Sequence, residues 1–330
     1  MIILVTGGSG FIGTNLIDEL LQHHYEVVNF DKAPPLKKAH SKYWVQGDIM
    51  NLAGMQAVFE KYKPTVVIHL AARTDTLSDK IEDYKENSLG TLNVLNVIKT
   101  IPSIERSIIT STQYVYKSLT KPFPDADDEY MPHTIYGHSK VKTEQYTRES
   151  NIQGVWTIIR PANIWGPWHM RYPKELWRMI DKGFYMHPGK KPVIRTYGYV
   201  KNIVHQIIGI MVAAPEQVNK RTFCVGDNPI DSYIWLNTIS NQLKGKNVNH
   251  LPISFFKLLS FSGDILRKVG IPFPLYAERF HNMIEDYYAP TNITVSQFGV
   301  ANPNLEENVA ETISWIKGEG NVFFEYWKAK

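Results

Sequence analysis

The segment from Met1 to Asp31 constrains the fold of this chain more than any other stretch. It begins with an apolar strand pattern over residues 1–5, which runs into a glycine-rich turn. An amphipathic helix pattern follows over residues 15–21, and a second strand pattern over residues 26–30 leads to Asp31. Strand, glycine turn, helix, strand and acid in this order predict the first unit of a parallel, dinucleotide-binding sheet.

The glycine turn predicts a site for the phosphates of a dinucleotide. Glycines let the backbone approach a pyrophosphate closely, and the amino end of the following helix favours an anion. We expect the turn to contact the cofactor through Gly7, Gly10, Phe11, Ile12 and Gly13.

The acid after the second strand favours NAD as the cofactor. Asp31 lies roughly 20 residues past the last glycine of the turn, where a carboxylate can accept hydrogen bonds from the adenosine ribose. Its negative charge would also repel the 2′-phosphate of NADP. Lys32 stands beside it and weakens that repulsion, so NADP stays open as the alternative.

The remaining chain predicts an α/β fold. Strand patterns alternate with helix patterns as far as residue 160, which predicts a Rossmann-type doubly wound parallel sheet. Beyond this point the alternation loosens in a stretch rich in proline and aromatic residues. We therefore expect an NAD-binding domain over residues 1–165. Residues 166–330 would mainly form a smaller C-terminal lobe for the substrate, with some segments returning to the sheet.

Composition limits the other classes of function. A net charge of +4 without basic clusters does not predict nucleic-acid binding, and a single cysteine excludes an internal disulfide. The first strand begins at Met1, and no apolar run reaches the roughly 18 residues of a membrane span, so we expect a cytoplasmic protein. The apolar stretch 253–275 has two interpretations, a helix packed in the lobe or a helix lying on a membrane surface.

Tyr136 and Lys140 carry the hypothesis of a reaction. Four residues apart on a helix predicted over residues 136–150, they share one face. A lysine ammonium near a phenol lowers the pKa of the phenol, so we expect Tyr136 to act as a general base toward a substrate hydroxyl. Thr112 ends a predicted strand, 106–112, at the same edge of the sheet as the glycine turn, and its hydroxyl can hold the reacting oxygen.

Several motifs together resemble the extended short-chain dehydrogenase/reductase family, in particular its NAD-dependent sugar-nucleotide epimerases and dehydratases. In chain order they are Thr6-Gly7-Gly8-Ser9-Gly10-Phe11-Ile12-Gly13, His69-Leu70-Ala71-Ala72, Asn87 with Gly90-Thr91-Leu92-Asn93, Ser111-Thr112-Gln113-Tyr114-Val115-Tyr116, Tyr136-Gly137-His138-Ser139-Lys140, and Arg160-Pro161-Ala162-Asn163-Ile164-Trp165-Gly166-Pro167. The resemblance implies a catalytic triad of Thr112, Tyr136 and Lys140.

The same resemblance implies roles for further residues. Tyr136 and Lys140 would also contact the cofactor, and Thr112 the substrate. The other cofactor contacts would be Asp48, Ile49, Leu70, Ala71, Ala72, Asn87, Pro161 and Ala162. Asn163 and Arg195 would bind the substrate, Arg195 through a diphosphate. We expect no metal, and we interpret His69 as a buried core residue.

The residues after Thr112 narrow the reaction. The family's dehydratases carry Asp-Glu there, whereas this chain has Gln113 and Tyr114, which argues against elimination of water. Epimerisation of a nucleotide-activated sugar through a transient keto intermediate is the favoured interpretation. The alternative is an NAD(P)-dependent reductase or dehydrogenase of a keto-sugar nucleotide or of another secondary alcohol, as in the hydroxysteroid and dihydroflavonol branches. The retained tyrosine and lysine argue against a non-catalytic dinucleotide sensor.

The resemblance also implies a homodimer. Relatives often pair through the helices that correspond to residues 88–100 and 137–150. We expect the first of these helices to offer an apolar contact face made of Leu89, Leu92, Val94, Leu95, Val97 and Ile98.

Overall fold

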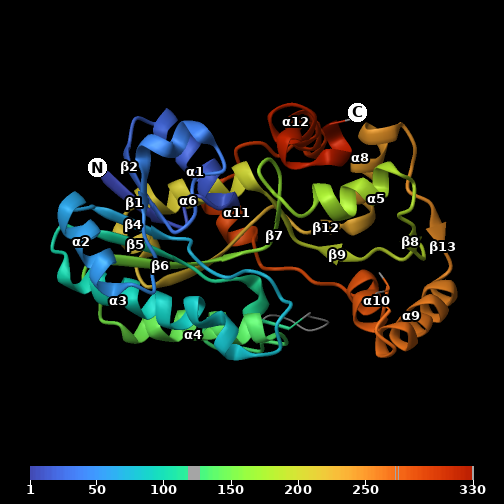
Figure 1. Cartoon of the computed structure of the whole chain (residues 1–330), viewed down its shortest axis with the longest axis horizontal. Helices are drawn as coiled ribbons and strands as arrows, with labels where there is room; N and C mark the ends of the chain where they lie inside the picture. The colour runs from blue at the N-terminus through green and yellow to red at the C-terminus, as the bar shows by residue number, and fades with distance from the viewer. Residues whose placement is uncertain (118–126, 272, 274, 329–330) are drawn as a thin grey trace.

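A seven-stranded parallel sheet forms the centre of the fold (Figure 1). The computed structural model describes residues 1–117, 127–271, 273 and 275–328. The strand order β11-β6-β5-β4-β1-β2-β3 reverses direction between β1 and β4, which confirms the predicted doubly wound sheet. The strands are β1 (Ile2–Thr6), β2 (Glu26–Asp31), β3 (Trp44–Gln46), β4 (Val66–His69), β5 (Arg106–Thr110), β6 (Val155–Pro161) and β11 (Arg221–Val225).

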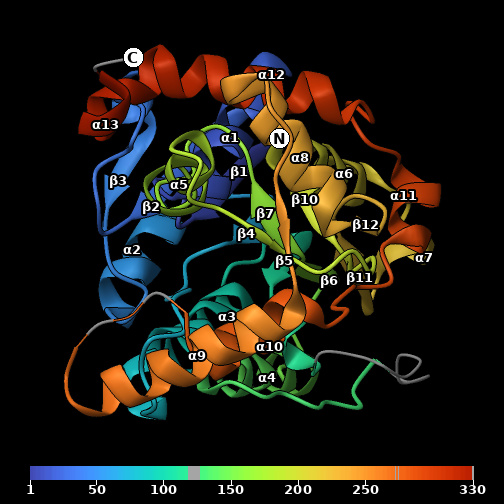
Figure 2. The ribbon, with the colours of Figure 1, turned by 90° about the vertical axis from the view of Figure 1, so that its right-hand side faces the viewer.

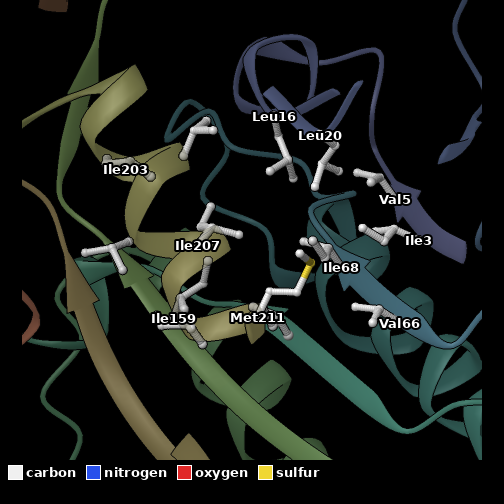
Figure 3. Packing of buried hydrophobic residues seen from close by; sticks show 14 of the residues in the cluster. Ile3, Val5, Leu16, Leu20, Val66, Ile68, Ile159, Ile203, Ile207 and Met211 are labelled. Atoms are coloured by element: carbon white, nitrogen blue, oxygen red, sulfur yellow. The ribbon is translucent and has the colours of Figure 1, made fainter. Parts of the chain in front are cut away.

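Helices cover both faces of this sheet. Ile3 and Val5 point to the face covered by α1 (Phe11–Gln22) and α6 (Val200–Val212), as Figure 3 shows. Leu4, between them, points to the other face and packs with residues of α2 and α3. Successive residues of a strand point to opposite faces, so an uninterrupted apolar run suits a strand that is buried on both sides. The helices of this second face are α2 (Leu52–Tyr62), α3 (Thr91–Thr100) and α4 (Ile135–Glu149).

The helix expected over residues 83–100 is interrupted. A 3₁₀ turn, η2 (Ile81–Tyr84), and a π-helical turn, η3 (Glu86–Gly90), precede α3. Most of the apolar residues that we assigned to a subunit contact are 0–3% exposed and pack in the protein's own core, namely Val94, Leu95, Val97 and Ile98. That part of the prediction is wrong, because a helical period shows that a face is apolar but not which neighbour covers it.

The chain after β6 both returns to the sheet and builds a second core. Within it, α6 packs on the sheet and β11 pairs with β6. Short strand pairs link the lobe: β7 (Asn163–Trp165) with β10 (Tyr197–Tyr199), β9 (Ile194–Arg195) with β12 (Ile230–Asp231), and β8 (His187–Pro188) with β13 (His250–Leu251). The tryptophans of the proline-rich stretch meet α8 and α12 in an aromatic cluster that includes Trp165, Trp168, Trp177, Trp235 and Trp315.

The remaining helices divide between the sheet and the lobe. Helices α7 (Pro215–Val218) and α11 (Asn292–Phe298) pack beside strands β6 and β11 of the sheet. The helices of the lobe are α5 (Arg178–Asp181), α8 (Ser232–Lys244), α9 (Ile253–Lys268), α10 (Ala277–Ile284), α12 (Leu305–Lys317) and α13 (Glu325–Lys328). The 3₁₀ and π turns elsewhere are η1 (Lys38–Tyr43), η4 (Gln113–Val115), η5 (Pro173–Trp177) and η6 (Glu319–Phe323).

Helices α9 and α10 lie at the end of the lobe opposite α12 (Figures 1 and 2). They pack on each other through a small apolar core of Phe256, Leu275 and Phe280. Over the described part of the chain, no helix is both long enough and apolar enough to cross a membrane.

Candidate active site

A cleft of about 800 Å³ opens at the carboxyl ends of the central strands. Ligands of doubly wound sheets bind at this edge, where the strand order reverses. Most of the predicted site residues line the cleft: Gly7, Gly10, Phe11, Ile12, Gly13, Asp31, Asp48, Ile49, Leu70, Ala71, Ala72, Thr112, Tyr136, Lys140, Pro161, Ala162 and Asn163. The predicted residues that do not line it are Asn87 and Arg195.

The glycine turn holds β1 and β4 at close range. Gly7 has φ +75°, and a Cβ there would lie 2.5 Å from the main-chain nitrogen of Ala71. A Cβ on Gly13 would lie 2.5 Å from the Gly7 carbonyl oxygen. Gly10 is the N-cap of α1, and no side chain among the described residues caps that end of the helix. The amino end of α1 therefore presents main-chain N–H groups at the cleft, as an anion site requires.

The carboxylate of Asp31 is fixed by the main chain. It accepts hydrogen bonds from the Ser9 nitrogen at 3.0 Å and from the Ala33 nitrogen at 2.9 Å. Burial raises the pKa of Asp31 above its ordinary value, and these hydrogen bonds oppose that effect. The Lys32 ammonium lies 4.0 Å from the Glu86 carboxylate, and its side chain is largely exposed.

Asn87 supports the wall of the cleft. Its side chain is fully buried and exchanges hydrogen bonds with the main chain of Arg73, at 2.8 and 2.9 Å. Its amide also donates to the Ser139 hydroxyl at 2.9 Å. Asn87 thus ties the segment after β4 to α4, the helix that carries Tyr136. We predicted Asn87 as a cofactor contact, and in the structure its side chain bonds instead to Arg73 and Ser139 beside the cleft.

Arg195 is directed toward the main chain of the neighbouring helix. Its guanidinium donates to the carbonyl oxygens of Asn282 and Glu285. The arginines that line the cleft are Arg171 and Arg279 together with Arg73. Sequence reasoning missed Arg171 and Arg279, because a loop residue and a residue of a short helix carry no periodic signal.

Thr112, Tyr136 and Lys140 all line the cleft. The Thr112 side chain is hydrogen-bonded to the Tyr136 phenol. Its hydroxyl oxygen also accepts from the Tyr114 nitrogen at 3.3 Å, as the cap of η4. The Lys140 ammonium, 1% exposed, donates to the Thr110 carbonyl oxygen at 2.7 Å.

The pKa of Tyr136 differs from our expectation. Burial raises the pKa of Tyr136 above 10, and the hydrogen bond from Thr112 offsets only part of this effect. Burial also disfavours the charged form of Lys140 and lowers its pKa to about 8. The expected lowering of the phenol pKa is therefore wrong for the protein without its cofactor: desolvation dominates, and the ammonium bonds to a carbonyl oxygen instead.

An aromatic group stands beside the triad in place of a carboxylic acid. The Tyr114 ring lies 6.0 Å from that of Tyr136, 5.6 Å from Tyr287 and 5.7 Å from His133, between centroids. Burial raises the pKa of Tyr114. Gln113 is buried, and neither residue has a carboxyl group that could supply or accept a proton in an elimination.

A buried ion pair fixes the helix that carries Tyr136. The Arg160 guanidinium binds both carboxylate oxygens of Glu144, each at 2.7 Å, with both side chains almost fully buried. Such bidentate pairs are geometrically specific. His69 lies behind the cleft, hydrogen-bonded to Thr6 at 2.7 Å and Thr91 at 3.0 Å, and burial lowers its pKa to about 3. This confirms His69 as a core residue.

The C-terminal lobe adds polar side chains to the lining of the cleft. Besides Asn163 and the arginines, the lobe contributes His169, Tyr172 and Glu175 to the lining. The Nδ1 of His169 accepts from the Tyr172 nitrogen at 2.9 Å, and burial lowers the pKa of this imidazole to about 4. A neutral His169 with Nδ1 occupied presents Nε2–H as a donor.

Comparison with known proteins places the chain in a family. Residues 3–226 match the NAD dependent epimerase/dehydratase family. A 3 beta-hydroxysteroid dehydrogenase/Delta 5-->4-isomerase of Mycobacterium tuberculosis is 30% identical over 66% of this chain and 60% of its own length. An N-acetyl-alpha-D-glucosaminyl-diphospho-ditrans,octacis-undecaprenol 4-epimerase of Escherichia coli O157:H7 is 29% identical over 62% of this chain and 61% of its own length. The chain thus spans about 60% of the length of these curated relatives.

Solved structures show the same fold over nearly the whole chain. The UDP-glucose 4-epimerase of Thermotoga maritima, with UDP-glucose, has a TM-score of 0.74 at 21% identity and covers 97% of this chain and 99% of its own. The Thermus thermophilus enzyme, in complex with NAD, has a TM-score of 0.71 at 20% identity and covers 96% and 99%.

This chain is a member of the NAD-dependent epimerase/dehydratase family, within the extended short-chain dehydrogenases/reductases. The cofactor of the family is NAD, and the cleft fits it. The glycine turn leaves an uncapped helix end for the pyrophosphate, and Asp31 is oriented for a ribose. The buried hydroxyls of Thr110 and Ser111, which line the cleft, have no hydrogen-bond partner among the described residues, so polar groups are available there.

Proposed function

We propose that this protein is an NAD-dependent epimerase of a sugar attached to a diphosphate, acting through a transient keto intermediate. One observation carries the proposal: the hydrogen-bonded Thr112–Tyr136 pair lies in a cleft that is also lined by three arginines and by polar side chains. Arginines match the charge of a diphosphate, and Asn163 and the Nε2–H of His169 match sugar hydroxyls.

The residues of the triad perform the proton transfers of this reaction. Tyr136, as phenolate, accepts the proton of the sugar hydroxyl whose carbon is oxidised, and it returns the proton when the ketone is reduced. Thr112 donates a hydrogen bond to the reacting oxygen, and Lys140 supplies a buried charge. NAD, when bound, would supply the hydride acceptor for that carbon and the hydride donor for either face of the ketone. Oxidation and reduction then balance within one turnover.

Binding of the oxidised cofactor would favour the phenolate. Burial holds the pKa of Tyr136 high in the protein alone, because desolvation of the phenolate outweighs the hydrogen bond from Thr112. A positively charged nicotinamide in the same cleft would compensate it. The activities of several relatives support epimerisation: a CDP-paratose 2-epimerase, a UDP-glucose 4-epimerase and the undecaprenol-linked 4-epimerase are among them. The absence of a carboxyl group at Gln113 and Tyr114 supports it against dehydration.

A second candidate is an NAD-dependent dehydrogenase of another secondary alcohol. The observation that favours it is the match to 3 beta-hydroxysteroid dehydrogenases, at 30% identity. Such an enzyme would use the same triad once and then release the reduced cofactor. The arginines in the lining of the cleft fit a bulky apolar alcohol less well than they fit a sugar diphosphate.

The first experiment is to denature the purified protein and quantify the nicotinamide cofactor that it releases. An epimerase recycles its cofactor within one turnover, so we expect near-stoichiometric NAD. Incubation with nucleotide sugars should then interconvert two epimers without net formation of NADH.

Net NADH, formed in proportion to oxidised substrate, would instead establish the dehydrogenase. The control is Tyr136→Phe, which removes only the proton acceptor. It should retain NAD and lose the interconversion. If Tyr136→Phe turned over at the wild-type rate, the proposed chemistry would be wrong.

A further inference from the structure

Helix α9 carries an apolar stripe that faces away from the protein. The side chains of the stripe are spaced by three or four residues, so they lie on one face of the helix and its C-cap. Each is between 48% and 68% exposed: Phe255, Leu258, Phe261, Ile265 and Val269. Ile271, just beyond, is 51% exposed. A contiguous exposed surface of this kind is unusual on a protein that has no partner.

The opposite face of α9 explains why the stripe stays exposed. Phe256, Ser260 and Gly263 are buried against the segment that leads to α10. At Gly263 a Cβ would collide with the carbonyl oxygen of Leu275, so the two backbones are in close contact. The helix is therefore anchored to the lobe along one side, and its apolar side is not turned toward the core.

Basic side chains lie along one margin of the stripe, and no charged residue interrupts it. On the helical projection, Lys257 and Lys268 flank the edge near Phe261, whereas Arg267 lies on the opposite side, where its guanidinium packs over the Tyr276 ring at 3.8 Å. At the amino end, exposed Lys190 and Lys191 follow Gly189, whose nitrogen donates to the Leu251 carbonyl oxygen just before α9.

The acidic side chain on α9 lies on the side that faces α10. Asp264 accepts a hydrogen bond from the Ala277 nitrogen at 3.3 Å. The combination is thus an apolar stripe with serines, bordered along one margin by lysine ammonium groups. It matches the boundary between the acyl chains and the headgroups of an anionic bilayer, where apolar side chains enter the acyl region and Lys and Arg bind phosphates.

We propose that α9 docks this protein on the surface of an anionic lipid bilayer. The stripe enters the headgroup region, and the flanking lysines Lys257 and Lys268 bind lipid phosphates. Charge complementarity favours this occupant over a second copy of the chain: a copy packed antiparallel across the stripe by two-fold symmetry would bring the two lysine margins together, and like charges repel.

Docking would place the cleft next to the lipid. Helix α10 packs against α9, and Arg279 of α10 lines the cleft. Helices α9 and α10 therefore connect the docking surface with the cleft. The inference depends on the geometry of α9 and not on which reaction the cleft performs.

The test is flotation of the purified full-length protein with vesicles. Vesicles of phosphatidylcholine alone are compared with vesicles that also contain phosphatidylglycerol. We expect binding to the anionic vesicles to exceed binding to the neutral ones at least several-fold and to fall as salt is raised. The native side chains of Leu258 and Val269 are 67% and 68% exposed and would enter the apolar region of the bilayer. The double variant Leu258→Asn/Val269→Asn should therefore weaken binding at least about tenfold.

The matched control also replaces two exposed aliphatic residues by asparagine, but at positions outside the stripe. Ile293→Asn/Val322→Asn changes positions that are 62% and 64% exposed on α11 and η6, and it should bind like the wild type. Lys257→Gln/Lys268→Gln should lose the preference for anionic vesicles. Circular dichroism and thermal unfolding establish that each variant is folded.

Three outcomes would overturn the proposal. One is a wild-type protein that does not float with anionic vesicles. Another is an equal loss of binding in the stripe variant and its matched control. The last is a wild-type dimer that becomes monomeric in Leu258→Asn/Val269→Asn while neither protein binds vesicles, which would assign the stripe to a second copy of the chain. Sedimentation velocity measures the oligomeric state, and none of these readouts requires the enzyme to be active.

Discussion

Replacing Lys140 by methionine is expected to stabilise the cofactor-free protein while it removes activity. The ammonium is 1% exposed and donates to the Thr110 carbonyl oxygen. Burial lowers the pKa of Lys140 from 10.5 to about 8, so the folded state holds a charged lysine at a cost. That difference in pKa corresponds to about 3 kcal/mol at neutral pH. Loss of the hydrogen bond to the Thr110 carbonyl oxygen destabilises the variant by about 1–1.5 kcal/mol. The net stabilisation of Lys140→Met is therefore about 2 kcal/mol.

The pH dependence of this effect follows from the sign of the shift. Between the folded pKa of about 8 and the unfolded pKa of 10.5, the unfolded chain binds a proton that the folded protein lacks. The wild type therefore gains stability relative to Lys140→Met as the pH rises through this window. We expect the advantage of the variant to shrink by about 1.4 kcal/mol between about pH 7 and pH 9.

Urea denaturation of both cofactor-free proteins at these two pH values measures the effect. Lys142→Met is the control, because Lys142 is exposed on the same helix; its stability should change by no more than about 0.5 kcal/mol at either pH. A Lys140→Met variant less stable than the wild type at neutral pH would refute the reasoning. So would an advantage that stays the same up to pH 9.

Further substitutions test the rest of the site. Tyr136→Phe should lower turnover by roughly 10²–10⁴-fold and leave NAD affinity, measured by calorimetry, within about twofold. Glu144→Ala leaves a buried guanidinium unpaired and should cost about 3–5 kcal/mol in urea denaturation, whereas the exposed Glu149→Ala should cost little. Gly7→Ala and Gly270→Ala both place a side chain at positive φ, but only the first would collide with main chain. We therefore expect a far larger loss of stability for Gly7→Ala, and equal losses would contradict the role of close packing.

The sequence by itself determined the sheet and the glycine turn at its edge. An apolar strand, a glycine turn and a helix are neighbours in the chain, so their pattern specifies their local geometry directly. The glycines of the turn and Asp31 lie at the expected edge for that reason. Tyr136 and Lys140 share a face because four residues make about one turn of a helix.

Only the tertiary structure decided which partners these residues have. Arg195 bonds to the carbonyl oxygens of residues 282 and 285, about ninety positions away in the chain, and no local pattern could show this contact. The apolar face of α3 turns into the core, whereas the stripe of α9 faces outward, although both have helical periods. The pKa of Tyr136 rises because the fold removes water from the phenol. Periodicity reports the character of a face, while burial and long-range contacts depend on how the elements pack, and they set the electrostatics of the site.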